Sequence, residues 1–402
     1  MSKYRIIGCS LPEDRGQIVG LQAALFSFKK KRGEATQYSV LCLLSSVFCP
    51  LARAVEFIKV NIMKIAGQAR IENNILDIAF APEAVYIPAG NGYPGGLFDT
   101  HLKPIRQALS HRGNDIRLSR PITDDIDFSA LPLIQSDRPY FFIGEINPHF
   151  GHFLLESTAR LWPLLQLTPG FAGKYLFFSQ KASSALLEKT FIKDIFGSMS
   201  LEPKDFVVYR KPCRLQNVFI APPAFEIRSQ GCPMFRQTMQ AIGNTLAKGL
   251  SEINNTNLTP LYLSKAKLTK GVSGIINEVD IEDSLRKKGV DIWHPETVDL
   301  ASQIKEISSR KYLIGSVGSA FHNLLFCPGD KIISGVVLGE KVNSNYIIID
   351  KLCGNIGRYE PGTDLGITLS TDANLCAKSG FMRTFYADEP DGVAETLLRN
   401  IR

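Results

Sequence analysis

Cysteine pairs and metal-binding spacings are missing from this sequence of 402 residues. Its 8 cysteines form no C-x-x-C pair and have no zinc spacing, which argues against a zinc finger or ribbon. The histidines discussed below do not lie in an H-E-x-x-H segment, so a zinc protease of that type is not indicated either. Several cysteines lie in apolar runs, as Cys327 does, and we therefore expect buried free thiols in a reducing cytosol.

Apolar runs long enough to cross a bilayer are also missing. The candidate at residues 38–52 is about 15 residues long, whereas a spanning helix needs roughly 20. It contains Pro50 and is followed by Arg53, and the start of the chain does not resemble a signal peptide. Because the basic cluster at 29–32 precedes it, the segment could lie on an anionic inner membrane surface; a plain core helix or helical hairpin is the alternative.

Long blocks of basic residues and short internal repeats are absent as well. The formal net charge is +7, an excess that suits phosphate-bearing ligands or an anionic membrane surface, and nothing indicates nucleic acid. Hydrophobic residues make up 45% of the chain and charged residues 21%, which excludes a disordered or fibrous protein. The length exceeds that of one ordinary hydrophobic core and predicts two domains.

Short apolar strands alternate with amphipathic helices, a pattern typical of α/β domains with parallel sheets. A first series has expected strands at 84–88, 140–143, 174–178, 206–209 and 217–220, and helices at 151–166, 182–196 and 234–249. A second series has strands at 261–264, 290–293, 312–315 and 331–334, and helices at 281–288, 299–309 and 320–326. We expect Pro163 to kink or end its helix, and an amphipathic helix at 388–402 to close the chain.

These patterns divide the chain into parts. We expect a basic and apolar helical extension at 1–75, a first α/β domain at 76–250, a second at 256–385, and a final helix at 386–402. The polar, turn-prone segment at 252–257 is the expected linker. In open α/β sheets ligands bind beyond the carboxyl ends of the strands, so the loops there should carry the chemistry.

The first such loop follows the expected strand at 140–143 and contains two histidines. His152 and Glu156 are four residues apart, so they share one helix face. The helix dipole favours a neutral imidazole near a helix start, and a neutral histidine oriented by a carboxylate can take a proton from a hydroxyl. His149 is a second candidate for this base. Structural histidines, or a metal site through His149 and His152, are the alternatives. Against the metal site, no second carboxylate and no cysteine cluster lie nearby in the sequence.

The second loop, residues 315–323, joins small residues to a helix. Such a loop lets the backbone approach a phosphate closely, although it is neither G-x-G-x-x-G nor a P-loop. Ser264 and Lys265 come just after residues 261–263 of the first strand in this second series, and they could add a hydroxyl and a cation to the same cleft. The alternatives are a merely tight turn and a solvated lysine.

Several segments over roughly residues 80–340 resemble glycosyltransferase family 61 in order and spacing. Residues 149–156, followed by Arg160-Leu161-Trp162, resemble the family signature. Tyr262-Leu263-Ser264-Lys265 resembles its Y-[IL]-S-R, with lysine where arginine is usual. The remaining matches are Asn277-Glu278 with its N-E pair, Pro295-Glu296 with its P-E pair, and residues 315–323 with its G-x-x-G-S-A-L-H-N, Phe321 occupying the leucine position. The first 75 residues resemble nothing that we can name.

The resemblance implies a GT-B-like fold: two Rossmann-like domains face a central cleft, and the C-terminal helix packs back on the first domain. It implies an inverting, metal-independent glycosyltransferase that uses a nucleotide sugar, UDP-sugars being the commonest. The implied base is His152 with Glu156, or His149. The implied donor-binding residues are Ser264, Lys265, Glu296, Ser316, Gly318, Ser319, His322 and Asn323. No cofactor and no essential divalent ion are expected.

The acceptor implied by the resemblance is a glycan or glycolipid of the cell surface, such as capsule or lipopolysaccharide, made by a bacterial enzyme in the cytoplasm. We expect peripheral contact with the anionic inner membrane, self-association as a further possibility, and no nucleic acid partner. Two other functions stay open. One is a non-catalytic sugar- or nucleotide-binding subunit of a polysaccharide assembly complex, and the other is a metal-dependent hydrolase using His149 and His152.

Overall fold

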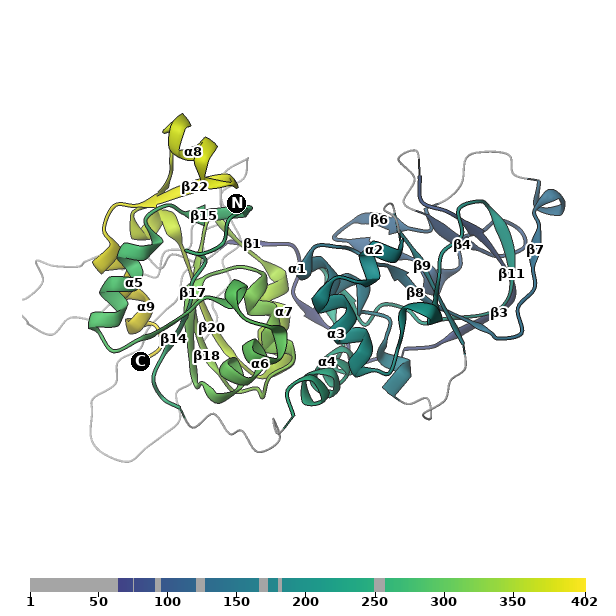
Figure 1. Ribbon diagram of the computed structural model, residues 1–402, viewed down its shortest axis with the longest axis horizontal. Coiled ribbons are helices and arrows are strands. Elements are labelled where there is room, and N and C mark those ends of the chain that lie inside the picture. Colours follow the sequence, from purple (N-terminus) through teal and green to yellow (C-terminus); the bar gives the residue numbers. More distant parts are fainter. Residues whose placement is uncertain are drawn as a thin grey trace, which may run out of the picture. The chain divides into compact units, whose positions relative to one another are not determined.

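The structure is a computed structural model that describes residues 64–74, 76–90, 95–120, 127–165, 173–179, 183–248 and 257–402. The predicted membrane-surface segment at 29–52 and most of the predicted linker at 252–257 lie outside these residues. The described part of the chain is a mixed α/β structure with two main sheets (Figure 1). Within it, no helix is long and apolar enough to cross a membrane.

The first sheet is mixed rather than fully parallel. Its strand order is β10-β9-β8-β11-β3-β4; the strands β10, β9, β8 and β11 are parallel to one another, whereas β3 is antiparallel to β11 and β4 is antiparallel to β3. Every predicted strand of this half is present, but the prediction of an all-parallel sheet is wrong at one edge. The bounds are β3 (Ala79–Ile87), β4 (Gly96–Phe98), β8 (Tyr140–Glu145), β9 (Lys174–Phe178), β10 (Phe206–Val207) and β11 (Cys213–Ile220).

The second sheet is fully parallel, with the order β16-β14-β17-β18-β20. Counted along the chain, this is the order 2-1-3-4-5 of doubly wound sheets, in which the direction of winding reverses between β14 and β17. Ligands of such sheets bind at the carboxyl ends of the two strands at this reversal. The bounds are β14 (Leu261–Leu263), β16 (Asp291–Trp293), β17 (Tyr312–Ser316), β18 (Ile332–Val337) and β20 (Ile356–Pro361).

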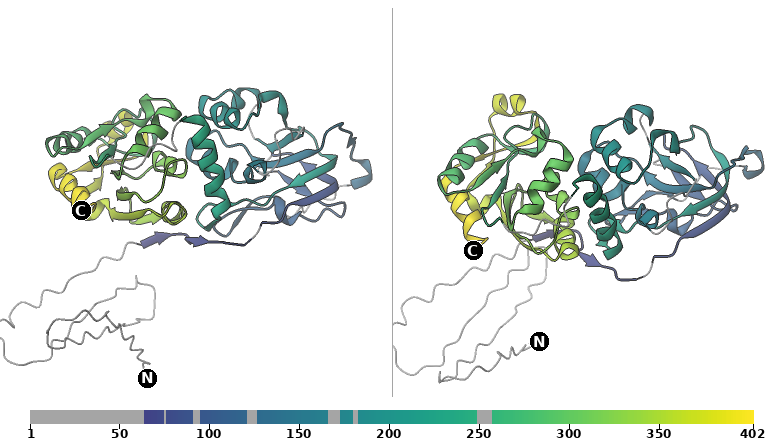
Figure 2. Two further views of the ribbon diagram at one scale, coloured as in Figure 1. Left: turned by 90° about the horizontal axis from the view of Figure 1, so that it is seen from below. Right: turned by 60° about the horizontal axis from the view of Figure 1, so that its bottom comes forward.

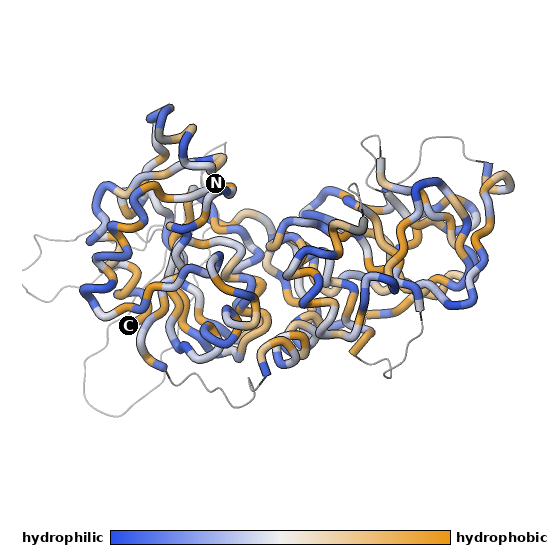
Figure 3. The backbone as a smooth tube through the Cα atoms, viewed as in Figure 1, coloured by the Kyte–Doolittle hydropathy of each residue, from blue (hydrophilic) through white to orange (hydrophobic). Residues whose placement is uncertain are grey.

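One hydrophobic core contains residues of both sheets and of the helices between them. Figure 3 shows that hydrophobic residues, in orange, follow the strands of both sheets. Helix α4 (Pro233–Leu246) buries Phe235, Met239 and Ile242 in this core and contacts both α3 (Thr190–Ser198) and α6 (Leu300–Ser309). A Cβ atom on Gly243 would lie 2.6 Å from the carbonyl oxygen of Phe326, so this helix packs closely against the second half. The thiols of Cys213, Cys232, Cys327 and Cys353 are buried and free.

The chain before β3 pairs with strands from both halves. β1 (Lys64–Ala66) runs parallel to β19 (Lys341–Asn343), and β2 (Arg70–Ile71) runs parallel to β13 (Gln230–Gly231). Nζ of Lys351 also donates to the carbonyl of Ala69 at 2.7 Å. Figure 2 shows this segment in purple, running along both halves.

The C-terminal helix does not pack on the first half, so that prediction is wrong. Helix α9 (Pro390–Arg399) contacts α5 (Glu278–Lys287) and the strands β17 and β18 of the second sheet. Its apolar face, with Val393 and Leu397, is buried against Ile281 and Leu285 of α5. The two helices cover each other because both have one apolar face.

Three predicted helices differ in form. The one expected at 151–166 is a short helix, α1 (Phe150–His152), followed by a π-helical turn, η3 (Phe153–Ser157), and a separate 3₁₀ turn, η4 (Trp162–Leu165). The one expected at 182–196 is two helices, α2 (Ser183–Leu187) and α3. The one expected at 320–326 is the 3₁₀ helix η8 (Ser319–Leu325). π-helical turns are rare and occur frequently at functional sites, which draws attention to the first of these.

Candidate active site

His152 and Glu156 lie on the α1–η3 segment that follows β8, and their side chains are hydrogen-bonded. Nδ1 of His152 is 2.6 Å from Oε2 of Glu156. The ring of His149 stands edge-on to that of His152, with 5.3 Å between the ring centres. The structure therefore brings together the three residues that the sequence singled out as base candidates.

Arg112, which sequence reasoning missed, completes this group. Its Nη2 atom donates to both carboxylate oxygens of Glu156 at 3.0 Å and lies 3.2 Å from Nδ1 of His152. No local pattern could reveal it, since it lies in a different strand, β5 (Ser110–Arg112). With Arg112 on Glu156, the carboxylate only accepts hydrogen bonds, so Nδ1 of His152 must carry the proton of their shared bond. Nε2 of His152 is then left with a free lone pair.

The surroundings of Glu156 and His149 shift the pKa of both residues. Burial raises the pKa of Glu156, but hydrogen bonds and charge from His152 and Arg112 outweigh it, so the pKa lies below its ordinary value. Burial and the neighbouring His152 and Lys189 lower the pKa of His149. A carboxylate with a lowered pKa is a weak base, so this arrangement favours Glu156 as the partner that orients an imidazole.

A cavity of about 350 Å³ opens at the carboxyl ends of β14 and β17, where the second sheet reverses its winding. This volume is within the range of ligand-binding pockets. Five of the predicted donor-binding residues line it, namely Ser264, Lys265, Glu296, Ser316 and Ser319. Phe150 and Phe191 from the first half form part of its wall. The hydroxyl of Ser316 is buried and has no hydrogen-bond partner among the residues that the structure describes.

Lys265 is the cation of this cavity, and its surroundings hold it in place. Its Nζ atom donates to the carbonyl of Val317 at 2.9 Å, and its backbone N–H donates to Glu278 at 3.2 Å. Burial lowers the pKa of Lys265, whereas the charge of Glu278 acts in the opposite direction. A Cβ atom on Gly318 would lie 2.6 Å from Cε of Lys265, so the glycine leaves room for the lysine side chain.

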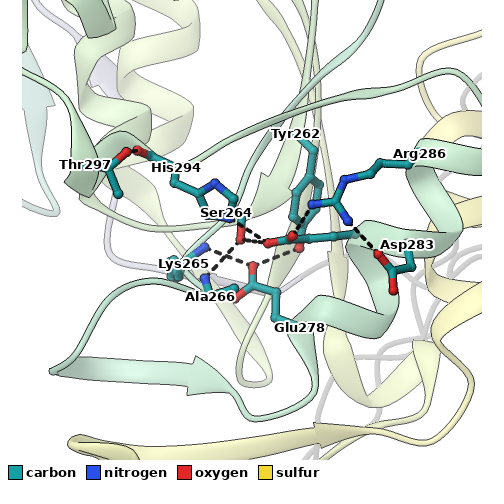
Figure 4. Close-up of polar contacts among 10 residues, drawn as sticks. Tyr262, Ser264, Lys265, Ala266, Glu278, Asp283, Arg286, His294 and Thr297 are labelled. Carbon is teal, nitrogen blue, oxygen red and sulfur yellow. Dashed lines mark hydrogen bonds and ion pairs between the residues drawn. The ribbon is translucent and has the colours of Figure 1, made fainter.

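Two buried carboxylates on α5, those of Glu278 and Glu282, support the end of β14, and Figure 4 shows Glu278 beside Tyr262 and Lys265. Glu278 accepts from the hydroxyl of Tyr262 at 2.9 Å. Glu282 accepts from Ser264 at 2.6 Å and from Nε2 of His294 at 2.9 Å, and its second oxygen accepts from Arg286. Sequence reasoning gave these carboxylates no role, although their spacing of four residues on one helix could have indicated a shared face.

The other three predicted donor-binding residues do not line the cavity. Gly318 packs against Lys265, as described above. Asn323 is fully buried, and its amide donates to Gln303 at 2.8 Å. The amide of Gln303 in turn donates to the carbonyls of Pro295 and Val298, so this pair connects η8 to the loop that carries Glu296.

His322 lies where the two predicted loops meet. A Cβ atom on Gly151 would be 3.2 Å from Cε1 of His322 and 3.0 Å from Cβ of Ser319. Burial, together with the nearby His152 and His149, lowers the pKa of His322 to about 3. Because His322 lies beside Gly151, the loop at 315–323 is directly next to the segment that carries His152.

In the described part of the chain, no group of three or more His, Cys, Asp or Glu residues could hold a metal ion. Residues 150–334 match the model of the family described as Glycosyltransferase 61. This stretch contains the His152–Glu156 pair and all the cavity residues that the sequence predicted, whereas Arg112 precedes it. No curated protein gives a significant match.

Proposed function

The chain carries a domain of glycosyltransferase family 61, and on this premise we propose that it transfers a sugar, with inversion, from a nucleotide-sugar donor to a hydroxyl of an acceptor glycan. The observation that carries the proposal is the close approach of Gly151 to Ser319 and His322. It brings the segment that carries His152 next to a cavity suited to a nucleotide sugar. We also propose the GT-B-like division of work, with the acceptor bound by the first half and the donor by the second.

His152 is the proposed base. Inverting transfer is a single displacement, so one group must take the proton of the attacking hydroxyl. Nε2 of His152 can accept this proton, because Nδ1 is engaged with Glu156 at 2.6 Å. The imidazolium that forms is then stabilised by the carboxylate of Glu156. His149, edge-on to His152, belongs to the wall of the acceptor site in this proposal.

The donor binds in the cavity at the ends of β14 and β17. Lys265, Ser316 and Ser319 hold the diphosphate, whose negative charge increases as the sugar leaves. Glu296 accepts hydrogen bonds from the ribose hydroxyls. A UDP-sugar is the proposed donor, and the lysine charge replaces the divalent ion that other glycosyltransferases use. A cell-surface glycan or glycolipid acceptor at the cytoplasmic face of the inner membrane completes the proposal.

A two-step experiment tests the proposal. The purified full chain is first screened by thermal shift against nucleotides and nucleotide sugars, since a ligand that binds only the folded state raises the melting temperature. UDP release is then measured with each stabilising donor and a panel of glycan acceptors, with and without EDTA. We expect turnover that EDTA does not change, and at least a hundredfold lower kcat in His152→Ala. Nucleotide binding without turnover would indicate a binding subunit, and EDTA-sensitive hydrolysis a metal enzyme.

A further inference from the structure

Arg112 is the charged residue in contact with both members of the His152–Glu156 pair. We infer that it is a positioning residue for the base: it holds Glu156 and thereby fixes which nitrogen of His152 carries the proton. This inference rests on the proposed function, and it concerns a residue outside the stretch that matches the family.

The geometry leaves His152 one arrangement of its proton. An arginine nitrogen can only donate, and Nη2 of Arg112 donates to both oxygens of Glu156 at 3.0 Å. Its distance of 3.2 Å from Nδ1 of His152 is then a contact and not a hydrogen bond, because both nitrogens carry protons. Glu156, held as a carboxylate between two donors, requires a proton on Nδ1 at 2.6 Å. Without Arg112, the Glu156 side chain could turn away, and either ring nitrogen of His152 could then carry the proton.

A buried arginine holds the backbone that presents Arg112. The Arg160 guanidinium donates to the carbonyls of Gln107, Ala108 and Leu109 and to the hydroxyl of Ser110. On the other side of Arg112, the N–H of Gly113 donates to the carbonyl of Ile227 at 3.0 Å. The strand that carries Arg112 is therefore fixed on both sides, as positioning of Glu156 requires.

Charge gives Arg112 a second effect on the base. The groups that face His152 are Glu156 on the same segment, His149 before it, Glu145 at the end of β8, His322 on η8 and Arg112 itself. Arg112 is the permanent cation in this set, so its charge partly neutralises that of Glu156.

The experiment combines NMR with kinetics on the full chain, labelled with ¹³C and ¹⁵N at its 6 histidines. Each ring is assigned through single His→Gln variants, and its titration and tautomer are followed in wild type, Arg112→Gln and Arg112→Lys. In Arg112→Gln, we expect the Nδ1–H tautomer of His152 to lose its dominance. Arg112→Lys retains a cationic donor to Glu156 and should keep the wild-type tautomer.

Kinetics with the best UDP-sugar donor supply the second readout. Because Arg112 contacts Glu156 and not the donor, we expect kcat to fall about tenfold in Arg112→Gln while the donor KM stays within twofold. The kcat of Arg112→Lys should fall less, since lysine keeps the charge, although it cannot span both carboxylate oxygens. Arg214→Gln is the matched control, because it removes another partly buried arginine–glutamate pair, Arg214–Glu83, from the same half.

The outcomes separate this inference from the proposed function. If Arg112→Gln shows the wild-type His152 tautomer and kcat, as Arg214→Gln should, Arg112 is not a positioning residue. If the wild type transfers no sugar, the proposed function is wrong, and the NMR measurement still decides whether Arg112 controls the His152 proton. If Arg112→Lys shows the same tautomer mixture as Arg112→Gln, a cationic donor to Glu156 does not fix the His152 proton, and the inference is wrong.

Discussion

Replacing Gly318 with alanine should separate ligand binding from stability. The backbone at Gly318 is extended, with φ of −163°, so alanine can adopt it without strain. The new methyl group would lie 2.6 Å from Cε and 2.9 Å from Nζ of Lys265. These atoms are the far end of a flexible side chain, and we expect the lysine to swing aside while the fold stays intact.

The magnitude follows from what the lysine loses. Its Nζ donates to the carbonyl of Val317 at 2.9 Å, and in the proposed function it also holds the donor diphosphate. A hydrogen bond to a charged group contributes about 1.5–3 kcal/mol. Misplacing Lys265 should therefore weaken UDP binding by about 10- to 100-fold. The free protein should lose at most about 1.5–3 kcal/mol, the contribution of the Lys265–Val317 hydrogen bond, since nothing else near Gly318 has to move.

Isothermal titration with UDP and thermal melts of the free protein measure these two quantities. A double-mutant cycle with Lys265→Ala tests the mechanism, because both changes act through the same side chain. We expect Gly318→Ala to have almost no further effect on UDP binding once Lys265 is gone. Additive losses, or a melting temperature of the free Gly318→Ala protein lowered by more than about 5 °C, would refute the reasoning.

Two further predictions concern buried charges. Arg160→Met should destabilise the fold by about 3–5 kcal/mol in urea unfolding, because it leaves the carbonyls that Arg160 binds unpaired in the interior; a loss below about 1 kcal/mol would contradict this. Burial raises the pKa of Asp350 to about 7, above its ordinary value of 3.8, so the folded state holds the proton more tightly than the unfolded state. Wild-type stability should therefore fall as the pH rises from about 4 to 7, and Asp350→Asn should lose most of that slope in urea melts at successive pH values.

The sequence predicted the strands well, because their apolar runs are buried in both sheets. It predicted the His152–Glu156 contact from a spacing of four residues, and the cavity position of Ser264 and Lys265 from their place after a strand. These are local features, and a helix turn or a strand end determines them.

What the sequence could not reveal depends on contacts between distant segments. Arg112 meets Glu156 across a distance of 44 residues in the chain, and Arg160 binds the backbone just before the strand that carries Arg112. The amphipathic pattern of α9 predicted that one face is buried, but it could not identify α5 as the partner, so the expected packing on the first half was wrong. The same limit applies to the residues predicted to bind phosphate. Asn323 does not line the cavity, because its amide pairs with Gln303 of another helix.

The pairing of β1 with β19 has a consequence for how the protein folds. Residues 64–66 can be hydrogen-bonded as a strand only after residues 341–343 have left the ribosome. Contacts between positions so far apart in the chain form late and slowly. During synthesis, a chaperone could therefore reach the segment at 64–66 long after the first sheet has its strands. A pulse-labelling experiment should find its amides among the last to gain protection.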